Sequence, residues 1–144
     1  MDIVSPEKRS KQMSRIKGKD TGIEIQVRRA LHVSGLRYRL GGAGLPGRPD
    51  LVFHRHRTVI FVDGCFWHGH DCHLFRLPKT RTEFWKAKID ANRMRDRRVD
   101  RDLEALGWRS LHVRECELRG KTELEQFQRL QLLAKEVLQG RPDA

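Results

Sequence analysis

The chain has 144 residues and a mass of 16.9 kDa, which is a length typical of one domain. No apolar run approaches the roughly 20 residues that span a bilayer, and the N-terminal segment lacks the apolar stretch of a signal peptide, so a membrane or secreted protein is not expected. Three cysteines, an odd number, argue against a disulfide framework and leave metal ligands or reduced structural thiols.

The charge is strongly basic. Lys and Arg number 30 against 19 acidic residues, the net charge is +11, and 21 of the basic residues are arginine. Residues 76–101 alone carry +6, whereas residues 102–114 are neutral. A solvated basic helix would explain some of this charge, but its uneven distribution favours a nucleic-acid partner, because each neutralised phosphate releases counterions. We expect a nucleic-acid partner and no membrane.

The first 34 residues predict two helices. Ser5 and Pro6 form a helix start for residues 5–16, where only Met13 and Ile16 are large and apolar, so this segment is expected to be an arm that orders on a partner. A second helix, over residues 21–34, has one apolar face and ends at a glycine.

The rest of the chain alternates between strand and helix patterns. Short β-rich runs at residues 36–40, 50–54 and 58–62 precede an irregular segment, 64–78. A long helix over residues 82–106 is followed by a strand at 108–113 and a last helix that opens with a Thr122–Glu125 capping box. The residues expected to face inward are Trp85, Ile89, Val99, Leu103 and Leu106 on the long helix, and Leu124, Phe127, Leu130, Ala134 and Val137 on the last one.

This order predicts an α/β domain with a mixed sheet flanked by helices. No repeat, low-complexity stretch or internal boundary divides it. We therefore expect residues 1–20 to be an N-terminal DNA-contacting arm and residues 21–144 to be a single domain.

Two aspartates are placed where a nuclease would need them. Asp50 opens one predicted strand after a Pro-Gly loop, and Asp63 ends the next strand, so the two carboxylates are expected to be neighbours. Such carboxylates suit Mg²⁺, which activates water and polarises a phosphate. A turn aspartate is the alternative for Asp50. The layout is similar to the PD-(D/E)xK restriction-endonuclease fold, although Cys65 stands where that motif has lysine.

Glu24 is a third candidate acid with two interpretations. It follows Thr21 by three residues, the spacing of a capping box in which its carboxylate accepts from the Thr21 amide. It could equally support catalysis, and the sequence does not separate the two roles.

The irregular segment predicts a metal site. Cys65, His70 and Cys72 are spaced so that one loop could wrap an ion, and Cys116, after the last strand, could supply a fourth ligand. Three thiolates and one imidazole make a closed tetrahedral set, which is typical of structural zinc. The spacing is not that of a standard zinc finger, and buried reduced thiols are the alternative.

Other side chains of this segment suit contact with DNA. If His70 binds zinc, for which His68 and His73 compete, His68 could serve as general acid or base in phosphodiester hydrolysis. Phe66 and Trp67 could stack on bases or wedge between them. Trp85 suits either stacking or the inner face of the long helix, and Trp108 is assigned to the core.

The chain resembles the very short patch repair (Vsr) endonucleases. The resemblance rests on PGRPD at 46–50, VIFVDGCFWH at 59–68, TRTEFWKAKI at 80–89 and RDRR at 95–98, and it covers residues 10–120 in order. It implies a restriction-endonuclease-like fold with a structural zinc. It also implies Mg²⁺-dependent nicking of DNA 5′ to the thymine of a T:G mismatch, which arises by deamination of 5-methylcytosine.

The resemblance also implies roles for particular residues. Asp50 and the backbone carbonyl of Val62 would hold Mg²⁺, His68 would be the catalytic acid/base, and Glu24 would support the site. The zinc ligands would be Cys65, His70, Cys72 and Cys116. The DNA contacts would be Phe66, Trp67 and Trp85 at the mismatch and Met13 and Ile16 in the minor groove. A monomer acting in the bacterial cytoplasm, at the nucleoid, is expected, and mismatch-repair proteins are possible partners.

One departure from the family pattern concerns the target. Where the best-known member has Thr-His, this chain has Val62-Asp63, so an imidazole is replaced by a carboxylate. This change makes a restriction-type nuclease that cuts unmismatched DNA an alternative. A non-catalytic zinc-dependent DNA-binding module is a third hypothesis, and a glycosylase, which would need no Mg²⁺, is a fourth.

Overall fold

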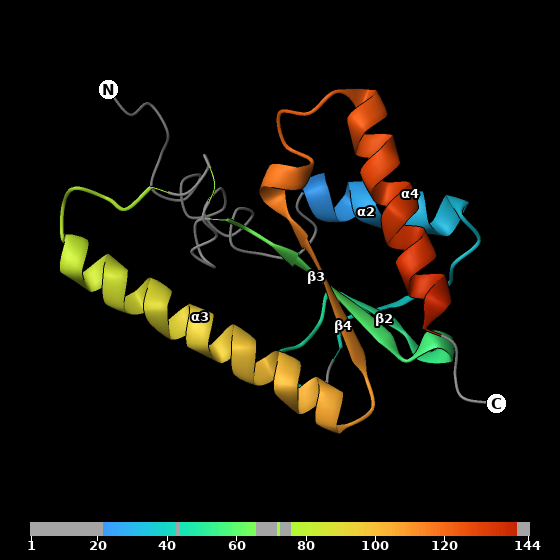
Figure 1. Ribbon diagram of the computed structural model, residues 1–144, viewed down its shortest axis with the longest axis horizontal. Coiled ribbons are helices and arrows are strands. Elements are labelled where there is room, and N and C mark those ends of the chain that lie inside the picture. The colour runs from blue at the N-terminus through green and yellow to red at the C-terminus, as the bar shows by residue number, and fades with distance from the viewer. Residues whose placement is uncertain (1–21, 43, 66–71, 73–75, 141–144) are drawn as a thin grey trace, which may run out of the picture.

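In the computed structural model the described residues are 22–42, 44–65, 72 and 76–140. They form one four-stranded sheet, ordered β1-β2-β3-β4, and three α-helices that pack on its two faces (Figure 1). This mixed sheet flanked by helices confirms the predicted α/β class. The predicted helix over 5–16 lies outside the described residues.

The sheet is part antiparallel and part parallel. β1 (Arg39–Leu40) pairs with β2 (Leu51–Phe53), and β2 pairs with β3 (Thr58–Asp63), both antiparallel. β3 then pairs in parallel with β4 (Arg109–Arg114), so the chain between them must cross over the sheet. That crossover contains the long helix α3 (Thr82–Ala105), as Figure 1 shows.

Helices α2 (Gly22–Val33) and α4 (Glu123–Gln139) cover one face of the sheet (Figure 1). Alternate strand residues point toward them and form the larger core, because neighbouring strand residues project to opposite faces. The sheet contributes Leu51, Phe53, Ile60 and Val113 to this core, and the helices contribute Val27, Leu31, Leu130, Leu133, Ala134 and Val137.

Helix α3 lies on the opposite face and makes a smaller core. Leu103 packs with Val52, Val59 and Trp108, so the assignment of Trp108 to the core is confirmed. The N-terminal half of α3 extends past the sheet, as Figure 1 shows. This half is therefore not packed on strands.

The loop before β2 is pinned between α3 and the sheet. Gly47 has a φ of 74°, and a Cβ there would lie 2.4 Å from Cγ1 of Val99 and 3.3 Å from the Phe61 ring. Only glycine allows both this backbone conformation and this close approach. The packing fixes the loop immediately before Asp50.

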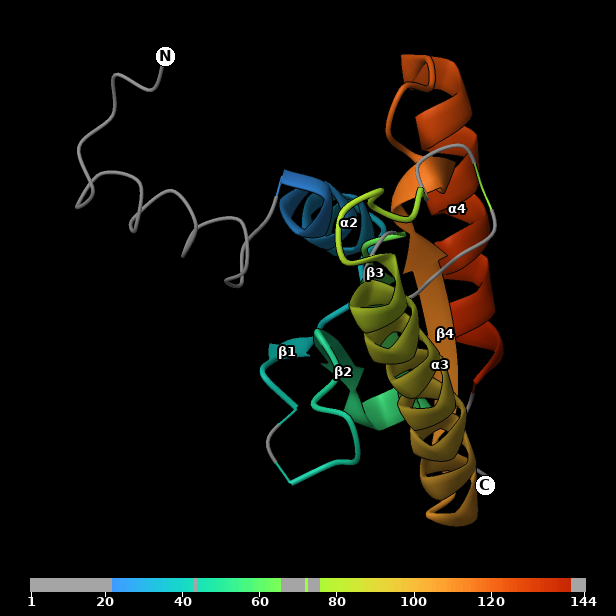
Figure 2. The ribbon, with the colours of Figure 1, turned by 90° about the vertical axis from the view of Figure 1, so that its left-hand side faces the viewer.

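Several boundaries differ from the predictions. The strand expected at 36–40 is reduced to two residues, and the strand expected at 50–54 ends at Phe53, because η1 (His54–His56) turns the chain toward β3. Leu124, Phe127 and Leu106 were expected to face inward but are 65 %, 57 % and 59 % exposed. They lie in the first turns of α4 and just after α3, where the helices pass the ends of the sheet (Figure 2). No helix among the described residues is long and apolar enough to cross a membrane.

Candidate active site and metal centre

Asp50 sits where the pinned loop meets the sheet. Its amide donates to the Ile60 carbonyl at 3.0 Å, and its carboxylate Oδ2 accepts from the Val62 amide at 2.7 Å. Burial, opposed by the Val62 hydrogen bond, and the negative charges of Glu24 and Asp63 together raise the pKa of Asp50 to about 6. A carboxylate in such surroundings gains strongly from a bound cation.

Glu24 approaches the same place from the first turn of α2. Its residue is 8 % exposed, and its carboxylate Oε2 accepts from Arg28 Nη2 at 3.3 Å. The charge of Arg28 also acts on Asp50, where it lowers the pKa. The capping interaction with Thr21 involves a residue outside the described part of the chain.

Asp63 ends β3 on the α3 side of the sheet, near Asp50. It is 7 % exposed, and its Oδ2 lies 2.7 Å from Nδ1 of His112 on β4. The other ring nitrogen of His112, Nε2, lies 2.9 Å from Oδ1 of Asp100 on α3. Burial by itself lowers the pKa of His112, but the hydrogen bonds and charges of the two carboxylates outweigh it and raise that pKa to about 9. The imidazole is therefore a cation at neutral pH, bound between two anions.

A cavity of about 450 Å³ adjoins this pair of residues. Its charged lining residues come from the loop before β2, from strands β3 and β4 and from α3, and they are Arg48, Asp63, Arg95, Asp96 and His112. Arg48 has a φ of 47°, a conformation uncommon for a residue with a side chain. The cavity thus combines acidic groups with guanidinium groups that suit phosphate.

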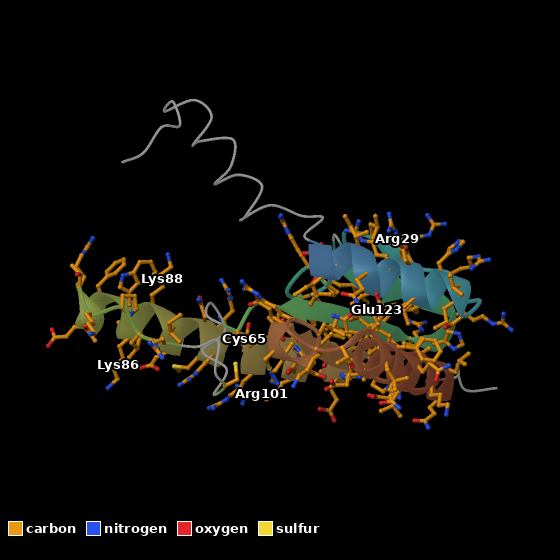
Figure 3. The ribbon with its side chains drawn as sticks, turned by 90° about the horizontal axis from the view of Figure 1, so that it is seen from above. Arg29, Cys65, Lys86, Lys88, Arg101 and Glu123 are labelled. Carbon is orange, nitrogen blue, oxygen red and sulfur yellow. The ribbon has the colours of Figure 1, made fainter. Side chains whose placement is uncertain are left out.

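Basic side chains continue along α3 beyond the cavity. Figure 3 shows Lys86 and Lys88 on the part of the helix that extends past the sheet, and Arg101 nearer to it. Positive charge of this kind suits the phosphate backbone of DNA, which it contacts without reading the sequence.

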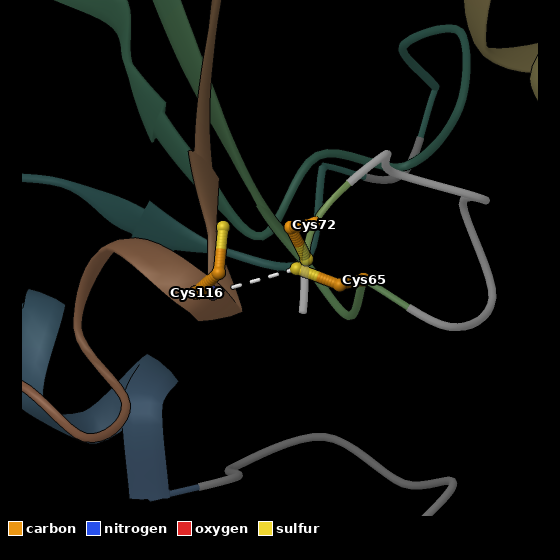
Figure 4. A group of neighbouring side chains, drawn as sticks. All are labelled: Cys65, Cys72 and Cys116. Carbon is orange, nitrogen blue, oxygen red and sulfur yellow. Dashed lines mark hydrogen bonds between the residues drawn. The ribbon is translucent and has the colours of Figure 1, made fainter. Parts of the chain in front are cut away.

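Cys65, Cys72 and Cys116 converge beside the end of β3. Their sulfur atoms all lie within 4.8 Å of one another, and Figure 4 shows the three side chains meeting. Cys65 is fully buried, and its sulfur accepts from the Cys116 amide at 3.4 Å. Burial raises the pKa of the Cys65 thiol to about 12 and also raises that of Cys116. The cluster could hold a metal ion, which would replace the thiol protons.

The cluster fits a thiophilic ion by its donors and spacing. In a tetrahedral zinc site with Zn–S bonds of about 2.3 Å, sulfur atoms are about 3.8 Å apart. The three sulfur atoms lie within 4.8 Å of one another, so a small rotation of the side chains would bring them to the spacing of a zinc site. The fourth predicted ligand, His70, lies outside the described residues.

Of the predicted DNA-contacting residues and the predicted acid/base His68, Trp85 alone belongs to the described part of the chain. Trp85 is half-buried on α3, and its ring meets Phe84 edge to face at 5.4 Å. The guanidinium of Arg81 lies over the Phe84 ring. The predicted residues that lie outside the described part of the chain are Met13, Ile16, Phe66, Trp67 and His68.

Sequence reasoning missed His112 and Asp100. The signal for His112 was a titratable residue within the predicted strand at 108–113, on the side that faces away from Leu111 and Val113. No spacing in the sequence links it to Asp100 or Asp63, because the three residues come from different elements.

Comparisons with known proteins indicate the family of this chain. A family model described as DNA mismatch endonuclease Vsr matches residues 1–74. The DNA mismatch endonuclease Vsr of Escherichia coli (strain K12) is 50 % identical over 123 residues, which is 85 % of this chain and 79 % of that protein. The type II nicking enzyme V.XorIIP of Xanthomonas oryzae pv. oryzae is 48 % identical over 124 residues, 86 % of this chain and 91 % of that protein.

A third relative is the type II nicking enzyme V.NmeAIP of Neisseria meningitidis, 40 % identical over 136 residues, or 94 % of this chain and 96 % of that protein. A basic α/β domain with a carboxylate cluster at its sheet, similar over most of its length to DNA-nicking enzymes, is an endonuclease that hydrolyses DNA phosphodiester bonds. The chain belongs to the Vsr family of DNA mismatch endonucleases. The resemblance found in its motifs is thereby confirmed.

Proposed function

We propose that this protein is a Mg²⁺-dependent endonuclease that nicks one strand of DNA 5′ to the thymine of a T:G mismatch. Such mismatches arise when 5-methylcytosine is deaminated, and the nick would start very short patch repair. The observation that carries the proposal is the Asp50 carboxylate, which is fixed by the Val62 amide and surrounded by two further acids. Membership of the Vsr family supports a DNA mismatch as the substrate.

In this proposal Asp50 and the backbone carbonyl of Val62 hold Mg²⁺. Oδ2 of Asp50 accepts the Val62 amide proton, which orients the carboxylate and leaves Oδ1 for the ion. When bound, Mg²⁺ stabilises the charge that develops on the phosphate and favours ionisation of water. His68 transfers the proton at the reacting oxygen, while Glu24 and Asp63 orient the groups around it.

We further propose that Zn²⁺ is the structural ion, bound by Cys65, His70, Cys72 and Cys116. The meeting of three thiols supports this assignment. The cluster joins the segment after β3 to η2 (Glu115–Glu117), the turn after β4. It would hold the segment that carries His68 against the sheet. A closed set of four ligands leaves no position for substrate, so the role is structural.

The DNA contacts are proposed from both ends of the molecule. Phe66, Trp67 and Trp85 would open or stack on the mismatch, and Met13 and Ile16 would reach the minor groove from the arm at residues 1–20. Residues 21–144 would be the single endonuclease domain, active as a monomer because one nick needs one site. Action at the bacterial nucleoid, with mismatch-repair proteins as possible partners, is part of the same proposal.

A restriction-type activity on unmismatched duplex is the second candidate. It is favoured by Asp63, which adds a carboxylate beside Asp50. It predicts cleavage that does not depend on the mismatch.

A nicking assay separates the candidates. One duplex is labelled on each strand separately, with T:G or T:A at the centre, and is incubated with Mg²⁺ or EDTA and with wild type or Asp50→Ala. Mg²⁺-dependent cleavage of the T strand in the T:G duplex alone, lost in Asp50→Ala, is expected. Equal cleavage of both duplexes would replace the mismatch function with the restriction-type function. Tight binding without cleavage under any condition would indicate a binding module.

A further inference from the structure

We propose that His112 is a positioning residue for the nicking reaction, and that with Asp100 it fixes the Asp63 carboxylate beside Asp50. The inference rests on the proposed function, since it names two residues that this site would need. It concerns the side chains on the α3 face of the sheet, where His112 lies between a strand end and a helix.

The strand register brings the three side chains together. In the parallel pairing of β3 with β4, His112 lies opposite Phe61, and Asp63 follows Phe61 by two residues on the same face. The imidazole stacks on the Phe61 ring at 5.1 Å with an interplanar angle of 15°. Its orientation in the plane is then set by Asp63 at Nδ1 and Asp100 at Nε2, at 2.7 and 2.9 Å. The stacking on Phe61 and the two hydrogen bonds together fix the position and the orientation of the imidazole ring.

This arrangement differs from ordinary packing of a core histidine. The Asp63 side chain is 9 % exposed, so a buried carboxylate depends on a charged donor. His112 lines the cavity that also contains Arg48 and Arg95, so the group that orients Asp63 borders the space next to the metal-binding acids. Many metal sites hold their acidic side chains through such partners, whose loss weakens activity.

The double hydrogen bond also limits what His112 can do. Each ring nitrogen of a protonated imidazole carries one hydrogen, and both are directed at carboxylates. His112 is therefore not placed to take a proton from water, and it acts through Asp63. We infer that Asp63 and His112 act as one unit.

Substitutions at His112 test this inference by geometry. Asparagine places an amide near the position of Nδ1, which faces Asp63, whereas glutamine places its amide near Nε2, which faces Asp100. Phenylalanine keeps the stacking on Phe61 and removes both donors. Single-turnover nicking should fall roughly 10- to 100-fold in His112→Phe and His112→Gln, and less than about fivefold in His112→Asn. The dissociation constant for DNA, measured without Mg²⁺, should change less than about twofold.

Asp100→Ala should lower nicking roughly three- to tenfold, because the imidazole loses its anchor on α3. Asp102→Ala is the matched control, because Asp102 is exposed on the same helix and its substitution removes the same charge. Nitrogen-15 NMR of the imidazole gives a readout besides activity. Wild type should carry protons on both ring nitrogens of His112 at pH 7.5, and Asp100→Ala should lose the signal at Nε2.

Several results would overturn the inference. Equal nicking by wild type and His112→Phe would show that Asp63 needs no positioning, and equal loss in Asn, Gln and Phe variants would indicate a general packing defect. A loss of DNA affinity as large as the loss of rate would make His112 a DNA-binding residue. If wild type cuts only unmismatched duplex, the mismatch function fails but the comparison is made on that duplex. A wild type that cuts no DNA overturns both.

Discussion

The two faces of the sheet are built for different tasks. The face covered by α2 and α4 has a core of twelve buried apolar residues, which include the fully buried Phe53, Leu31 and Leu133. Among the described residues, the face covered by α3 has a core of four buried residues flanked by Leu45, Phe61 and Val99, and it also carries the contact of His112 with Asp63 and Asp100. Apolar burial is thus concentrated on the face covered by α2 and α4, whereas the contact of His112 with two carboxylates lies on the face covered by α3.

The contact of His112 with Asp63 and Asp100 therefore lies on the face of the sheet that has the smaller apolar core. Burial raises the pKa of Asp50 to about 6, so keeping this carboxylate ionised at neutral pH opposes folding. The large core on the other face offsets that cost. The predictions that follow test whether activity and stability can be changed separately, one face at a time.

The largest effect is expected from Asp50→Asn. Nicking should fall roughly 1,000-fold or more, because the ligand oxygen loses its charge. The melting temperature at pH 7, without added Mg²⁺, should rise by about 2–4 °C, because a neutral amide removes the repulsion from Glu24 and Asp63. Nicking assays and thermal unfolding measure the two changes. Asp102→Asn, on exposed α3 surface, is the control, and a lower melting temperature in Asp50→Asn would contradict the argument.

On the opposite face, Leu133→Ala should give the reverse result. Leu133 is fully buried in the larger core, so its truncation should destabilise the fold by about 3 kcal/mol through lost burial and a cavity. Nicking by the folded fraction at low temperature should stay near wild type. Leu132→Ala is a matched control, because Leu132 is 55 % exposed on the same helix and should change stability by less than about 0.5 kcal/mol. Urea unfolding measures both.

A third prediction concerns pH and the α3 face. The pKa of His112 is raised to about 9 in the folded protein, above the ordinary value of 6.5, so the folded state binds this proton more tightly. The resulting stability is fully present below pH 6.5 and is lost as pH rises through 9. The melting temperature of wild type should therefore exceed that of His112→Phe by about 2–5 °C at pH 6 and by much less at pH 9.5. A constant difference would show that the charge of His112 contributes nothing.

The smallest effect is expected at the start of α4. The Thr122 hydroxyl accepts from the Glu125 amide at 3.2 Å, and the Glu125 carboxylate lies 3.4 Å from the Thr122 amide, which completes a capping box. Thr122→Ala should cost about 1 kcal/mol of stability with no change in nicking. Urea unfolding of Thr122→Ala and Thr122→Ser gives the comparison, since serine keeps the cap. An equal loss in both would exclude capping as the cause.

Sequence patterns predicted those features that depend on neighbours along the chain. The β-rich run at residues 58–62 predicted a strand, and the Thr122–Glu125 pair predicted the start of α4. Helical spacing identified the apolar side of α4 but not where the sheet beneath it ends, so the exposure of Leu124 and Phe127 was missed. Periodicity in a sequence shows which side of a helix is apolar, but it does not show how far the sheet that packs against that side extends.

The candidate site was predicted to different extents for the same reason. Cys65, Cys72 and Cys116 were found because cysteine is rare and all three were available for one cluster. His112 was not found, because its contact with Asp63 spans 49 residues and depends on the register of two parallel strands. Register is fixed by side-chain packing that a single sequence does not display.

The parallel pairing of β3 with β4 also has a consequence for the order of assembly. Paired residues such as Thr58 and Arg109 are 51 positions apart, so this ladder closes later than the β2–β3 hairpin. During synthesis, Asp63 and the first two cysteines leave the ribosome well before His112 and Cys116. A chain that stops before β4 has neither the third thiol nor the imidazole of His112 that contacts Asp63. The candidate site is therefore complete only after β4 has been synthesised and has paired with β3. An unfinished chain contains Asp50 and Asp63 but lacks the strand that carries His112.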